Sequence, residues 1–186
     1  MIKNKFPQLI DYKELKKTLA KLPKQGAVYA VSHWQDNIRK RGGMPVNGKL
    51  QKFKKRRYDT RLQKDKKILF GKGNMVDSIR IISESENTVV LGINSPATRE
   101  YAKAHQEGAE IEVTSKMKSF FWSQYYKNGG KESDNPDANF WRAMALKKEG
   151  SKIKIPERKF MEITPDIEKG IFREFVFELD KFFNEL

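Results

Sequence analysis

Cysteine is absent from the 186-residue chain, and histidine occurs only twice, as His33 and His105. Without cysteine the protein can form no disulfide and offers no thiol nucleophile or thiolate metal ligand. No uninterrupted apolar run reaches the roughly 18 residues that a membrane-spanning helix needs, and the first residues lack the apolar segment of a secretory signal. We therefore expect a soluble protein that is made and kept in the cytoplasm.

Acidic residues are also scarce, because 38 lysines and arginines face 24 aspartates and glutamates, which gives a formal net charge of +14. Such an excess favours polyanionic neighbours: nucleic acid, an acidic membrane surface or an acidic protein. Ten of the cations lie in residues 47–67, where only Asp59 and Asp65 oppose them. This composition predicts an exposed arm or loop rather than a packed element.

The arm supplies the candidate contact residues of the sequence. The six cations that we expect to contact a subunit or DNA are Lys52, Lys54, Lys55, Arg56, Arg57 and Arg61. Phe53 and Tyr58 lie among them and could stack on bases while the cations neutralise phosphates. Docking on another subunit fits the same composition equally well.

No pattern of catalytic or metal-binding residues is present. The two histidines lack HxxxH or HExxH spacing, and Gly71-Lys72-Gly73-Asn74 lacks the rest of a phosphate-binding loop. We expect His105 to be a hydrogen-bonded residue in the last turn of a helix, where an imidazole also interacts well with the helix dipole. A site that combines both histidines with distant carboxylates is the alternative. The sequence thus predicts no catalytic residue, no metal, no cofactor and no enzyme activity.

Hydrophobic periodicity predicts an α+β fold, with one small antiparallel sheet packed by helices and a long terminal helix. Helices are expected over 8–22 and 24–42, separated by Pro23, and over 97–106, stopped by Gly108. A hairpin should span 79–91, and strands should cover 109–114 and 151–156. The terminal helix should begin at Thr164, as N-cap, and Pro165. We expect one domain over 1–186, with the basic arm at about 47–67 and an insertion at about 115–150 that holds two short helices.

The order of several short motifs resembles that of the phage virion morphogenesis family, the tail-completion proteins of tailed bacteriophages and related prophages. The similarity spans roughly residues 34–180 and departs from the family at Lys72, where threonine is usual, and in the length of the insertion. The matching blocks include YAxxHQxG and IPxRxF, and the residues that carry the resemblance as structural positions are Trp34, Gly73, Ser78, Tyr101, His105, Gln106, Gly108, Pro156, Arg158 and Phe160.

The resemblance implies a structural role in virion assembly, at the head-proximal end of the tail or in the neck, where finished tails join DNA-filled heads. It implies a ring of copies of this chain, with six matching the tail symmetry, and the tail-tube and neck or connector proteins as partners. The protein would then be assembled in the host bacterial cytoplasm and end in the virion, with non-specific contact to DNA in the channel and none to a membrane. A nucleic-acid-binding protein that uses residues 49–67 is the alternative.

Overall fold

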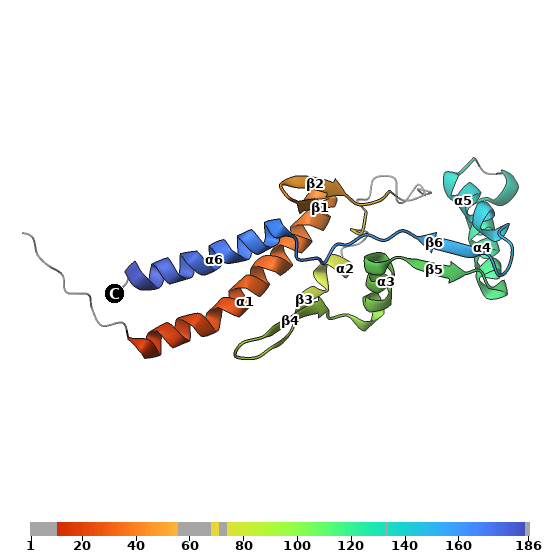
Figure 1. Ribbon diagram of the computed structural model, residues 1–186. Helices are drawn as coiled ribbons and strands as arrows, with labels where there is room; N and C mark the ends of the chain where they lie inside the picture. The colour runs from red at the N-terminus through yellow and green to blue at the C-terminus, as the bar shows by residue number, and fades with distance from the viewer. Residues whose placement is uncertain (1–10, 56–67, 71–73, 133, 185–186) are drawn as a thin grey trace, which may run out of the picture.

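The computed structural model describes residues 11–55, 68–70, 74–132 and 134–184. The fold is α+β, as predicted. The molecule is elongated: a pair of long helices forms one end, a small helical lobe forms the other, and three β-ribbons with short helices lie between them (Figure 1).

Helix α1 (Tyr12–Asp36) is continuous through Pro23, so the expected break at this residue was wrong. The side chain of Asp11 caps its start by accepting hydrogen bonds from the first turn. A proline inside a helix removes one backbone hydrogen bond and costs about 3 kcal/mol. The packing of the rest of α1 offsets this cost, because its buried face supplies Ala30 and Trp34 to the main core. The chain continues as a π-helical turn, η1 (Asn37–Arg41), and leaves it at Gly42.

Helix α6 (Pro165–Asn184) runs antiparallel along α1, and these two elements form one of the most extensive helix contacts in the fold (Figure 1). Two glycines make the close approach possible. A Cβ on Gly170 would lie 2.1 Å from Tyr29 Oη, and one on Gly26 would lie 2.9 Å from Ile171 Cγ2. The terminal helix therefore packs on α1, whereas the prediction was that it packs on a sheet.

The start of α6 differs from the prediction in one detail. The carbonyl of Thr164 accepts a hydrogen bond from the N–H of Glu168, so the helix begins where expected. The hydroxyl of Thr164, however, is buried and has no hydrogen-bond partner within the described parts of the chain. Thr164 starts the helix through its backbone, and the predicted side-chain cap is not formed.

The first part of the predicted basic arm is exposed as expected, but it forms a β-hairpin strand rather than an arm or loop. Strand β1 (Gly43–Val46) pairs with β2 (Lys49–Lys52) through a turn at Asn47 and Gly48, whose φ angles are 51° and 74°. Asn-Gly is the favoured pair for such a left-handed two-residue turn. Phe53, directly after β2, is buried in the main core, and residues 56–67 lie outside the described residues.

A second hairpin confirms the prediction for residues 79–91. Strand β3 (Ile79–Glu84) pairs with β4 (Val89–Ile93) and follows the short helix α2 (Asn74–Asp77). Both strands contact α1. In the described chain the strands form three separate two-stranded ribbons, not the one small sheet predicted, because the edges of the ribbons do not pair with one another.

Helix α3 (Pro96–Glu107) ends at Gly108 as predicted, and β5 (Ala109–Glu112) follows and pairs with β6 (Lys152–Ile155). The insertion between these strands holds α4 (Ser115–Lys127), a short 3-10 turn, η2 (Gly130–Glu132), and α5 (Pro136–Ala145), in line with the two helices expected. These helices pack on each other around their own small core of Phe121, Met144 and Ala145. The assignment of the whole chain to one domain stays a prediction.

Candidate functional site

The YAKAHQEG and IPERKF motifs, which are far apart in the sequence, meet where α3 joins the segment after β6. Nη1 of Arg158 lies 2.7 Å from Nδ1 of His105, and the backbone N–H of Arg158 donates to the carbonyl of His105 (2.6 Å). Arg158 is buried although it is charged, so these hydrogen bonds replace those to water that the guanidinium loses on burial. Tyr101, one turn earlier on α3, places its ring edge-on to the His105 imidazole at 4.4 Å.

Gln106 fastens the same joint on its other side. Its side-chain oxygen accepts hydrogen bonds from the backbone N–H groups of Phe160 (3.0 Å) and Met161 (3.1 Å). Its amide nitrogen donates to the Met161 carbonyl at 3.4 Å. Phe160 is buried in the main core, as the resemblance implied. The adjacent His105 and Gln106 thus bind opposite ends of one short segment, and we call this arrangement the 105–161 clip.

Backbone geometry fixes the turn between α3 and β5. Gly108 has φ of 77°, which a side chain would strain, and a Cβ there would lie 3.2 Å from the backbone nitrogen of Glu157. Pro156 supplies a carbonyl that accepts from Arg158 Nη1 at 3.3 Å. Gly108, the last residue of the YAxxHQxG motif, therefore allows the close approach by which the two motifs lie side by side.

The other residues of the resemblance support the core around the clip. Trp34 is buried and donates from its indole N–H to the Glu162 carbonyl at 3.0 Å, which ties α1 to the chain just after the IPERKF segment. Ser78 is buried and its hydroxyl donates to the Met75 carbonyl at 2.7 Å. Gly73 lies outside the described residues.

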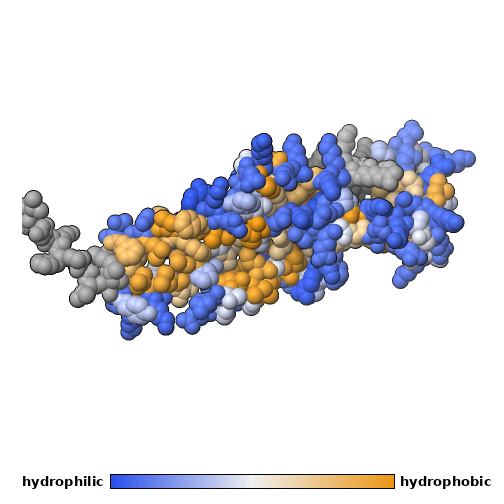
Figure 2. Space-filling view, viewed as in Figure 1, coloured by the Kyte–Doolittle hydropathy of each residue, from blue (hydrophilic) through white to orange (hydrophobic). Residues whose placement is uncertain are grey.

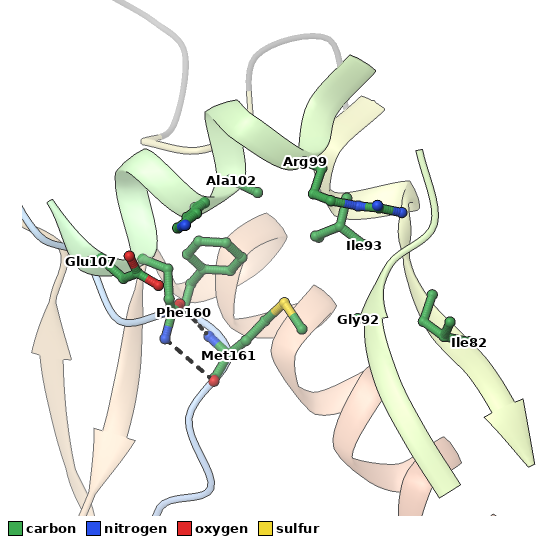
Figure 3. Close-up of a pocket in the computed structure, with 10 residues that line it drawn as sticks. Ile82, Gly92, Ile93, Arg99, Ala102, Glu107, Phe160 and Met161 are labelled. Carbon is green, nitrogen blue, oxygen red and sulfur yellow. Dashed lines mark hydrogen bonds between the residues drawn. The ribbon is translucent and has the colours of Figure 1, made fainter. Parts of the chain in front are cut away.

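A groove of about 530 Å³ lies beside the clip, between α3, the β3–β4 ribbon and residues 160–161. Figure 3 shows Phe160, Met161, Ala102 and Ile93 around it, with Ile82 and Gly92 on the strand side. Arg99, Lys103 and Glu107 stand at its rim and leave the lining mainly apolar. No local sequence pattern indicates this groove, because its lining comes from three segments that only the fold brings together.

The basic segment begins at the clip. Nε of Arg158 donates to the carbonyl of Lys54 at 2.8 Å, so the chain is held there just before the residues that the structure leaves undescribed. Lys52, Lys54 and Lys55 are all exposed, which agrees with their predicted availability for contact. The remaining predicted contact residues, Arg56, Arg57 and Arg61, lie outside the described residues.

The second histidine, His33, lies in a different hollow, together with Arg41, Asp166 and Tyr29. Burial lowers the pKa of His33 below its usual 6.5, Arg41 lowers it further, and Asp166 and Asp36 partly oppose the shift. The Tyr29 ring stacks on the imidazole at 5.7 Å. Because the two histidines belong to different clusters, the alternative of one site built from both was wrong.

Neither hollow has the composition of a metal centre. In the described segments there is no group of three or more His, Cys, Asp or Glu side chains placed to hold a metal ion. The groove beside the clip is mainly apolar, with Arg99, Lys103 and Glu107 among its lining residues. No described helix is both long and apolar enough to cross a bilayer.

Comparison with protein families agrees with this reading of the motifs. The model of the phage virion morphogenesis family matches residues 42–179, which include the clip and all the residues that line the groove. The chain belongs to this family, and its role is in the assembly of a phage virion. No curated protein and no solved structure matches the chain.

Proposed function

We propose that the protein acts at the head-proximal end of the phage tail or in the neck, where it completes the tail and helps to join it to the head. Its family supports a role in virion assembly. The observation that supports the finer assignment is the 105–161 clip, whose hydrogen bonds join the family motifs beside a mainly apolar groove. In this proposal the groove receives a protein partner.

In this proposal the chain works as a ring, with six copies matching the symmetry of the tail. A ring requires a contact between two different surfaces of neighbouring copies. The groove is one such surface, because its concave apolar lining fits a protruding apolar side chain and its rim carries both charge signs. The tail-tube protein and the connector proteins of the neck are the other partners, and the chain has no enzymatic role.

A second role is DNA binding by residues 49–67. It is favoured by the exposure of Lys52, Lys54 and Lys55 next to the clip. In a ring around the DNA channel these lysines would face phosphates, so this role would accompany head–tail joining. A steep loss of DNA affinity with salt, measured on the purified chain, would support it.

The groove gives the sharpest test of the assembly role. Ile82 lines the groove and is half-exposed, so Ile82→Asp should leave the fold intact while placing a charge in the contact. Val28→Asp, an equally exposed aliphatic position on α1 outside the groove, is the control. We expect phage that carry Ile82→Asp to produce filled heads and free tails with few joined particles, counted by electron microscopy. Normal joining by Ile82→Asp would remove the groove from the proposal.

A further inference from the structure

Helix α6 carries two apolar rows, and only one of them is covered within the described chain. The covered row packs against α1, where Ile171 and Phe175 meet Gly26. The second row runs beside it along the helix and consists of Phe172, Val176, Leu179 and Phe183. We call these four residues the outer row of α6.

Three members of the outer row are open to solvent, and the fourth, Leu179, is partly buried. Phe172 is 66% exposed, Phe183 is 50% exposed and Val176 is 39% exposed. Single exposed apolar residues are common, but a continuous row on one helix marks a contact surface. Figure 2 shows hydrophobic side chains gathered over the α1–α6 pair at this end of the molecule.

The spacing of the outer row identifies the kind of partner. Its members follow one another at intervals of four, three and four residues, which is the heptad pattern of a helix that packs along a second helix. A globular surface or a strand would not require this spacing over three turns. The partner of the outer row is therefore a helix aligned with α6.

The charges beside the outer row on one α6 are complementary to those on an antiparallel copy of the same helix. Arg173 directly follows Phe172, and Asp180 directly follows Leu179, so both flank the row on the same side. In an antiparallel pair of identical helices, Phe172 would face Phe183 of the partner subunit, and Val176 would face Leu179 of the partner subunit. The same register brings Arg173 close to Asp180 of the partner subunit, and the two-fold axis repeats this pair.

We propose that two copies of this chain associate through antiparallel pairing of their α6 outer rows. The contact produces a four-helix arrangement in which each α6 lies between its own α1 and the other α6. In the antiparallel orientation the rest of each subunit, beyond its α1–α6 pair, lies at the opposite end of the contact from that of its partner, so the two subunits do not collide. This association goes beyond the ring proposed for the virion, because a two-fold contact closes as a dimer and needs no tail.

Charge exchange tests this register in the purified full-length chain. Arg173→Asp places two acidic side chains opposite each other at both ends of the contact, so we expect dimer dissociation to become about tenfold easier. Adding Asp180→Arg restores opposite charges and should return the dissociation constant to the wild-type value. Sedimentation equilibrium over a range of protein concentrations measures all three proteins. Failure of the double exchange to recover dimerisation would overturn the antiparallel register.

A second pair of variants distinguishes specific pairing through the outer row from non-specific hydrophobic association. Phe172→Ser combined with Phe183→Ser should give a folded monomer, with an unchanged far-UV circular dichroism spectrum. Phe177→Ser is the matched control, because Phe177 is 64% exposed on the same helix but lies off the row. The control should dimerise as the wild type does. A monomeric wild type would overturn the proposal, and the outer row would then bind a helix of a tail or neck protein. Equal loss of dimer in the control would also overturn it.

Discussion

Arg158 meets His105 at the joint between α3 and the chain after β6, with Nη1 of the arginine 2.7 Å from Nδ1 of the imidazole. Because the arginine is always charged and donates only, the imidazole nitrogen that faces it acts as the acceptor. The histidine of the YAxxHQxG motif therefore holds the joint together.

The first prediction concerns the stability of this joint. His105→Ala removes one acceptor from a buried arginine, which should lower the free energy of unfolding by about 1–3 kcal/mol. Lys103→Ala, an exposed position on the same helix, should change it by less than about 0.5 kcal/mol. Urea unfolding measures both. In a cycle with Arg158→Met, the two effects should be strongly non-additive, and additive losses would show that the pair is not coupled.

The same histidine gives a chemical expectation. We expect no stoichiometric metal in the purified protein, because neither histidine lies in a described group of metal-ligating side chains. Elemental analysis of the wild type and of His105→Ala measures this directly. One tightly bound zinc ion per chain that disappears in the variant would contradict a structural role for His105.

The second prediction concerns pH and His33. Burial and Arg41 lower the pKa of His33 in the folded protein, while the unfolded chain keeps the usual 6.5. The unfolded state therefore binds more protons as the pH falls below about 6.5, and stability decreases with falling pH until the folded-state pKa is passed. His33→Gln should remove this part of the decrease, seen as a smaller loss of melting temperature on acidification. Equal losses in both proteins would show that His33 does not titrate differently on folding.

Several parts of the fold were predictable because their signals are local. The β3–β4 hairpin, the stop of α3 at Gly108 and the two helices of the insertion each follow from neighbouring residues. The break predicted at Pro23 was wrong, because the local cost of the proline is outweighed by the packing of α1 from Leu22 to Trp34. The β1–β2 hairpin has a local signal in Asn47-Gly48, but the dense positive charge around it favours an unpaired arm in any prediction from composition.

The candidate site was less accessible from the sequence. The motif residues His105, Gln106, Arg158 and Phe160 stood out through resemblance, yet their pairing depends on the return of the chain after a long insertion. The groove has no signal of its own, since Ile82, Ala102 and Met161 are ordinary apolar residues until the fold brings them together. Long-range proximity of this kind cannot be read from periodicity.

The third prediction concerns the basic segment. Changing Lys54, Lys55, Arg56 and Arg57 to glutamate reverses four charges of the basic segment, so a contact with an acidic partner or with DNA should be lost. Reversal of Lys116, Lys118, Lys147 and Lys148 in the α4–α5 lobe is the control for net charge alone. We expect the first variant to be missing from purified particles and the control to be incorporated.

Other outcomes distinguish the two roles of the segment. Normal incorporation of the variant with failed DNA retention or delivery would make the segment a DNA-contacting element. Normal incorporation together with full infectivity would contradict both roles and leave residues 54–57 as solvated surface. Protein composition of the particles and plaque counts on the same preparations measure these outcomes together.

Reconstitution of head–tail joining tests the central claim most directly. A phage that lacks this gene product should accumulate filled heads and separate tails, and the purified protein, added to that lysate, should bind the head-proximal end of the tails as a ring and restore joined, infectious particles. Electron microscopy of the tails before and after addition, with infectivity measured in parallel, gives the result. Joined and infectious particles in the lysate without the protein would contradict the account, as would protein bound at any other place on the particle.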